Sequence, residues 1–191
     1  MKTLTWLALP ALAGCALTLS ACKQDVPAAT STETTDVSST ADMAASSSDA
    51  VVDAATYVAK AGAGDLFEIE SSRAILKTTK NAQVKDFAEM MIKAHEESTA
   101  KVKAAAKAAD LNVAPPKLST EMTLKLTAIK AAPAGETADR LYLGAQRQGH
   151  KDALALHQGY AAGGDTPALK AVAAEIAPIV EQHIAMLDKI G

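Results

Sequence analysis

From Val51 onward, apolar residues recur three and four positions apart, and this spacing restricts the chain to amphipathic helices. Alanine is frequent, β-branched runs are few, and glycine or proline falls mainly between the periodic segments. The pattern predicts five helices, at about 53–79, 81–109, 119–131, 136–162 and 167–190. Asp53, Ser119 and Thr166 are predicted N-caps, and Pro167 suits the first position of the last helix.

The joins after the first and fourth segments are short, so each predicts an antiparallel hairpin. Two such hairpins predict an all-α fold, an antiparallel four-helix bundle with the short third segment in its crossover. A single apolar stripe on each of two segments supports this bundle. The stripes are Val84, Phe87, Ala88, Met91, Ile92, Val102 and Ala109 in the second segment, and Leu169, Val172, Ile176, Ile179, Val180, Leu187 and Ile190 in the last.

The start of the chain has the pattern of a secretory signal over residues 1–21. A positive Met1-Lys2 precedes an apolar, uncharged run at 3–19. The stretch Leu19-Ser-Ala-Cys22 resembles the lipobox of bacterial lipoproteins, which implies cleavage before Cys22 and lipid on its thiol. Lys23 stands where the resemblance places aspartate in lipoproteins kept at the inner membrane. We therefore predict an outer-membrane lipoprotein whose domain faces the periplasm or the cell surface.

Three alternatives for this segment stay open. Leu12-Ala-Gly-Cys15 is a second, weaker lipobox, and the apolar run could instead stay as an uncleaved anchor, although Pro10 and Gly14 interrupt it. A disulfide between Cys15 and Cys22 is the third. Because the chain has only 2 cysteines, cleavage before Cys22 would leave none for a disulfide framework in the folded domain.

Residues 22–50 carry the lipidated cysteine and a predicted flexible tether. The segment is rich in Ser, Thr and Ala and lacks aromatic residues, so it cannot offset the entropy of ordering. The folded domain is therefore placed at 51–191. Basic residues are scattered among acids, and few aromatics follow the signal, so nucleic acid is not an expected partner. These aromatics are Tyr57, Phe67, Phe87, Tyr142 and Tyr160. The predicted partner is the membrane, through the lipid on Cys22.

Polar residues interrupt the apolar faces of the four long segments. His95 and His183 each lie seven residues, or two helical turns, from apolar residues on both sides. His150 and His157 are seven apart on the flank of the fourth segment's apolar face, and Glu68 has the same heptad spacing in the first segment. Burying such groups is costly unless they are hydrogen-bonded, ion-paired or bound to a metal.

One hypothesis is that Glu68, His95, His150 and His183, one from each long helix, converge in the core and hold a divalent transition metal. Imidazole suits Zn, Cu, Fe and Ni. The alternative is a buried hydrogen-bond network that sets the helix register, with water or backbone carbonyls as partners. We interpret His157 as a flank or solvent residue.

The di-iron carboxylate pattern requires a Glu-x-x-His motif on each of two helices. The residues three positions before the histidines are Ile92, Arg147, Leu154 and Val180, so this motif is missing and ferritin-type iron oxidation is disfavoured. The sequence also has no Gly-x-Ser-x-Gly motif and no phosphate-binding loop. It therefore predicts no particular enzyme.

Four groups of residues resemble a bacterial family of unknown function, commonly labelled as outer-membrane or exported proteins with a ferritin-like domain. They are Tyr57-Val58 with Ala61-Gly-Ala-Gly-Asp-Leu-Phe-Glu68, Val84-Lys-Asp-Phe-Ala-Glu-Met-Met91 with His95, Asp139-Arg-Leu-Tyr142 with His150, and Ala177-Pro178 with His183. The resemblance covers about residues 53–187 and implies the fold and an envelope location, without an established activity. This sequence departs from the family pattern at Ala94, where an aspartate is usual, and at Ala138, where a phenylalanine is usual.

Two functional hypotheses follow. The first is an envelope-anchored lipoprotein that displays the bundle as a non-enzymatic, stress-related or interaction module. The second is a divalent-metal-binding protein that uses Glu68, His95, His150 and His183, with redox chemistry open to it.

Overall fold

The structure is a computed structural model that describes residues 52–190. The predicted signal, the tether and Cys22 lie outside the described residues.

Five helices make up this part of the chain, and no strand occurs within residues 52–190. They are α1 (Ala54–Ile75), α2 (Ala82–Ala108), α3 (Thr120–Ala131), α4 (Glu136–Gly163) and α5 (Pro167–Leu187). All five predicted helices are confirmed. Helices α1 and α5 end a few residues earlier than predicted, because the chain tightens into turns there. Lys77 N donates to Ala74 O at 3.2 Å, and Ile190 N donates to Leu187 O at 3.3 Å.

Short polar side chains begin three of the helices by accepting bonds from free backbone N–H groups. Asp53 accepts from Thr56 N at 2.7 Å, Asn81 from Gln83 N at 2.9 Å, and Ser119 from Met122 N at 3.1 Å. The prediction for Thr166 is correct in position but wrong in chemistry. Its side chain makes no capping bond, because its hydroxyl donates to Asp165 Oδ1 at 3.0 Å instead.

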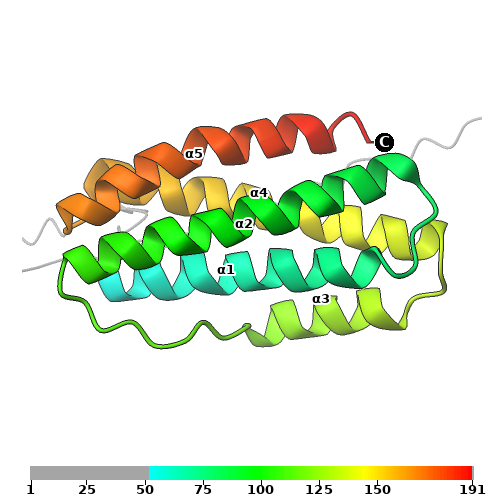
Figure 1. Cartoon of the computed structure of the whole chain (residues 1–191), viewed down its shortest axis with the longest axis horizontal. Coiled ribbons are helices and arrows are strands. Elements are labelled where there is room, and N and C mark those ends of the chain that lie inside the picture. Colours follow the sequence, from blue (N-terminus) through cyan, green and yellow to red (C-terminus); the bar gives the residue numbers. More distant parts are fainter. Residues whose placement is uncertain (1–51, 191) are drawn as a thin grey trace, which may run out of the picture. The chain divides into compact units, whose positions relative to one another are not determined.

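The four long helices form two antiparallel hairpins, α1 with α2 and α4 with α5 (Figure 1). The hairpins pack α1 against α4 and α2 against α5, so each long helix is antiparallel to both of its neighbours. The connection from α2 runs back along the bundle, and α3 within it packs on α1 and α4. This confirms the predicted four-helix bundle with a short extra helix in the crossover.

The buried apolar residues form two separate clusters along the bundle. One cluster includes Phe87, Met91 and Leu187, and the other includes Val102, Ile176 and Val180. On α2, His95 falls between Met91 of the first cluster and Val102 of the second. On α5, a histidine likewise falls between Val180 and Leu187. The core is therefore interrupted midway by a polar layer.

Within residues 52–190, no helix combines the length and the apolar character that crossing a membrane would need.

Candidate metal centre

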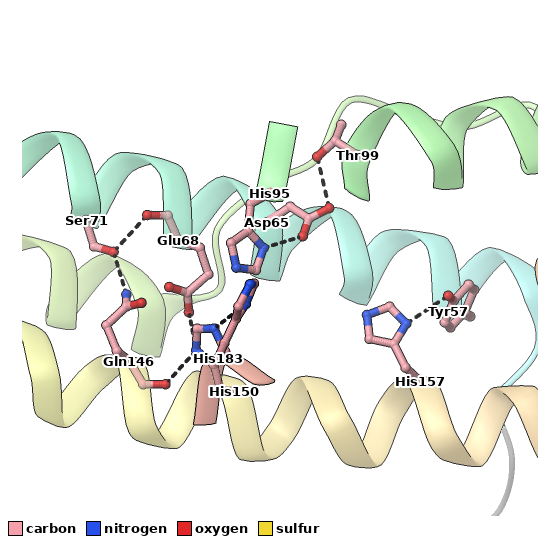
Figure 2. A network of polar contacts seen from close by, with 10 residues as sticks. All are labelled: Tyr57, Asp65, Glu68, Ser71, His95, Thr99, Gln146, His150, His157 and His183. Atoms are coloured by element: carbon pink, nitrogen blue, oxygen red, sulfur yellow. Dashed lines mark hydrogen bonds and ion pairs between the residues drawn. The ribbon is translucent and has the colours of Figure 1, made fainter. Parts of the chain in front are cut away.

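Three histidines from three different helices meet in this polar layer (Figure 2). His95 lies on α2, His150 on α4 and His183 on α5, and their side chains point toward one another. One ring nitrogen of each lies within 4.8 Å of one ring nitrogen of the other two. The residues are 7%, 1% and 5% exposed, so the cluster is buried. Such convergence allows one ion to be reached from three helices.

A carboxylate on α1 orients the first of these rings. His95 Nδ1 lies 2.8 Å from Asp65 Oδ1, and Asp65 Oδ2 accepts from the Thr99 hydroxyl at 2.9 Å. In the neutral form of the ring, a carboxylate acceptor places the imidazole proton on Nδ1 and leaves the lone pair on Nε2. His95 Nε2 is buried and has no hydrogen-bond partner among the residues that the structure describes.

Backbone geometry orients the second ring. His150 Nδ1 lies 2.9 Å from the carbonyl oxygen of Gln146, one turn earlier on α4. A carbonyl can only accept, so Nδ1 donates and Nε2 keeps its lone pair. His150 Nε2 lies 3.3 Å from His183 Nδ1. His183 Nδ1 is therefore the donor in this contact.

Burial controls the protonation of the cluster. Burial, together with the charge of His95, lowers the pKa of His150 to about 3 and that of His183 to about 4. Both rings are therefore neutral at pH 7, the form in which imidazole binds a metal ion. Burial also lowers the pKa of His95, but the Asp65 hydrogen bond and the charges of Glu68 and Asp65 outweigh it, so the net pKa is raised.

Glu68, the fourth predicted ligand, lies beside the three histidines rather than within the group that shares the 4.8 Å limit. Its Oε1 is 3.9 Å from His150 Nδ1, and its Oε2 is buried without a partner among residues 52–190. Burial raises the pKa of Glu68 to about 7, against the charge of His95, which lowers it. A Cβ atom at Gly149 would lie 2.6 Å from Glu68 Oε1, so the glycine makes room for this carboxylate.

The interpretation of His157 as a flank or solvent residue is wrong. It is 3% exposed, and its Nδ1 lies 3.0 Å from the hydroxyl of Tyr57. Tyr57 in turn stacks on Tyr160, with ring centroids 4.0 Å apart. Figure 2 shows Tyr57 and His157 apart from the three-histidine cluster, with His157 farther along α4 than His150. Close packing of α1 against α4 buries a position that helical spacing alone places at the edge of the apolar face.

A cavity of about 840 Å³ adjoins the histidines. Its wall includes His95, His150, His183 and also His157. Much of the remaining wall consists of small residues from α1 and α4, among them Ala59, Ala63, Gly64, Ala153 and Gly159. The cluster therefore faces open space on one side.

Two residues that position the centre were not predicted as site residues. Asp65 and Thr99 fix His95, although they belong to different helices. Asp65 lies three residues before Glu68, on the same face of α1, and that spacing is the signal that could have found it.

Together the fold and the site define an all-helical bundle domain with a buried three-histidine cluster. The chain belongs to the DUF4142 family, described as a domain of unknown function, whose profile matches residues 38–190. This confirms the expected membership in a family of unknown function.

A solved structure, "Crystal structure of DUF305 fragment from Deinococcus radiodurans", is similar in fold. Its TM-score is 0.63 at 14% identity, over 72% of this chain and 93% of that chain. At this identity the likeness shows the fold alone. No curated protein matches the chain.

Proposed function

We propose that this domain binds one divalent transition metal ion through His95, His150 and His183. The observation that carries the proposal is the convergence of three buried imidazoles from three helices, with ring nitrogens within 4.8 Å of one another. Neutral imidazole is the commonest protein ligand for such ions, and Zn, Cu, Fe and Ni all accept it.

The hydrogen-bond alternative accounts less well for the same atoms. A structural network stabilises a core only when each of its buried members has a partner. His95 Nε2 has none among residues 52–190, and leaving such an atom unpaired costs about 1–3 kcal/mol. A metal would use this lone pair and that of His150 Nε2.

Each residue then has a defined task. Asp65 and the Gln146 carbonyl hold the Nδ1 protons of His95 and His150, so that both rings present Nε2. His183, a neutral ring, would move its Nδ1 proton to Nε2 or turn its other nitrogen inward. His95, whose pKa is raised, is the ring expected to release a proton when the metal binds. Glu68 remains a predicted fourth ligand. A bound ion would supply Lewis acidity and, for a redox-active metal, electron transfer.

Metal content tests this proposal. The protein is purified under native metal supply, without chelators, and its metal is measured by elemental analysis. We expect about one ion per chain, since the donor set forms a single centre. His95→Ala and His183→Ala should each lose the ion, because each removes one of three ligands.

The matched control is His157→Ala. It removes a buried histidine from the same cavity wall without touching the three-histidine cluster. This variant should keep its metal. Metal content far below one ion per chain in the parent protein, together with no uptake of added Co²⁺ or Zn²⁺, would overturn the metal site. The non-enzymatic display module would then be the remaining hypothesis.

We further propose that the domain is displayed in the cell envelope by lipid on Cys22. The support is the apolar run at 3–19 and the small residues before Cys22. Each buried CH₂ of an acyl chain contributes about 0.8 kcal/mol, so two or three chains hold a protein where a single one is marginal.

Labelling with radioactive palmitate in a bacterial host tests the anchor. The parent chain should incorporate label and sediment with membranes, and Cys22→Ser should do neither. Cys15→Ser is the control and should be labelled like the parent. Label that follows Cys15 instead would refute the assignment to Cys22.

A further inference from the structure

The cavity beside the histidines is far larger than a metal ion requires. Its volume of about 840 Å³ falls in the range of roughly 300–1,000 Å³ that is usual for small-molecule sites. Three imidazoles alone leave one position of a four-coordinate ion open, and with Glu68 bound the ion would take an incoming group as a fifth ligand. We propose that this cavity binds a small organic carboxylate, whose carboxylate group coordinates the ion and whose apolar body fills the cavity. This inference rests on the proposed metal site.

Two glycines in helix interiors help to keep the cavity open. Gly64 on α1 and Gly159 on α4 both line it, and a Cβ atom at either position would meet no atom within 4 Å. Glycine inside a helix is less stable than alanine by about 0.5–1 kcal/mol. No close approach of another element requires glycine at these two positions. At both positions the wall of the cavity therefore carries no side chain.

The wall suits an apolar body. Besides the alanines and glycines, it includes Phe67, Leu156, Ile176, Ile179 and Val180. His95, whose buried Nε2 has no partner among residues 52–190, is part of this wall, so a ligand in the cavity lies beside the proposed metal ligands. An apolar body with one donor group at its end matches this arrangement of apolar walls around a polar end.

The charges on the wall favour an anionic donor group. Lys60 and Lys117 line the cavity, are exposed, and make no ion pair within residues 52–190. Lys101 is paired with Glu97 at 3.1 Å. Most acidic residues of the wall likewise already take part in a hydrogen bond or an ion pair.

Asp65 accepts from His95 and Thr99, and Asp152 accepts from Gln148 at 2.8 Å. Glu68 is the remaining acidic residue of the wall, and its Oε1 lies 3.9 Å from His150 Nδ1. The two unpaired lysines and the ion therefore attract an anion toward the cavity.

The test uses the full chain loaded with Co²⁺ and a series of probes, acetate, butyrate and octanoate. Binding is followed by calorimetry and by the visible spectrum of Co²⁺, which responds to a new ligand on the ion. We expect all three probes to change the spectrum. Affinity should rise by about fourfold for each added methylene, because each one leaves water for an apolar wall.

Gly64→Leu and Gly159→Leu should weaken octanoate binding much more than acetate binding. Each leucine would fill part of the cavity that the octanoate chain needs, while the coordination position on the ion would stay free. Gly144→Leu is the matched control. It lies on α4, its Cβ would also meet no atom within 4 Å, and it does not line the cavity. Circular dichroism checks that each variant is folded. If a variant does not fold, the probe series in the parent chain still tests the proposal.

The failures of the two proposals are distinguishable. If the chain takes up no Co²⁺, the metal site is overturned and this inference with it. If Co²⁺ binds but octanoate binds no more tightly than acetate, or octanoate binds without changing the spectrum, only the carboxylate proposal is overturned.

Discussion

Replacing Asp65 with alanine is expected to lower the free energy of unfolding by about 3–5 kcal/mol, the usual cost of breaking a buried pair from one side. Asp65 is 5% exposed, and both of its oxygens are used, by His95 Nδ1 at 2.8 Å and by Thr99 at 2.9 Å. Alanine leaves a buried imidazole N–H and a hydroxyl without their acceptor. Urea unfolding at pH 7, in the presence of a chelator, measures the loss.

Asp65→Asn separates this structural effect from metal binding. The amide keeps the size of the side chain but replaces the charged acceptor, so affinity for the metal should fall by about 10–100-fold, as for other partners of metal-binding histidines. Asp152→Asn is the control, an exposed acid of the same cavity, and should change stability by no more than about 0.5 kcal/mol. If Asp65→Ala lowered the free energy of unfolding by less than about 1 kcal/mol, the pair of Asp65 and His95 would not stabilise the core as a buried pair does.

The helices could be predicted because their signals are local. Asp53, Ser119 and Pro167 act within one or two turns of the helix that each one begins. The long crossover was also predictable, because Pro115 and Pro116 oppose helix in the stretch that follows α2 and the next segment is too short to span the bundle. Thr166 was mispredicted because its hydroxyl has a nearer acceptor in Asp165, a choice that depends on side-chain orientation.

The site could be predicted only in part. His95 and His183 were detectable because each interrupts an apolar stripe, and a polar residue in a stripe must find a partner. The partner of each histidine could not be predicted. Asp65 pairs with a residue 30 positions away, and the spacing within a helix says nothing about which side chains of two helices meet. His157 was missed for the same reason, since its burial comes from α1.

The polar layer between the two apolar clusters costs the bundle stability. Continuous packing of Leu, Ile or Phe through the midpoint would stabilise the bundle more than histidines do, because polar groups lose hydration when they are buried. The chain instead places its three-histidine cluster there and opens a cavity beside it. Stability is therefore lower than the fold allows, a pattern expected where a site has a function.

His157, which lies outside the proposed ligand set, should make the stability of the fold depend on pH. Burial lowers its pKa from 6.5 to about 4, with the charge of Asp65 raising it and that of His95 lowering it. Below pH 6.5 the unfolded chain therefore binds a proton that the folded chain does not. Stability is lost as the pH falls from 6.5 to about 4, by about 1.4 kcal/mol per pH unit for this residue.

In His157→Gln this contribution is missing, so between pH 7 and pH 4.5 the parent protein should lose about 3 kcal/mol more than the variant. Urea unfolding at the two pH values, with a chelator present, measures the difference. Tyr57→Phe is the control. It removes the hydroxyl 3.0 Å from His157 Nδ1 but keeps the ring that buries the histidine, so the pH dependence should persist. Equal pH dependence in the parent and in His157→Gln would mean that the imidazole takes up its proton in the folded state, and that its surroundings are far wetter than the packing of α1 on α4 indicates.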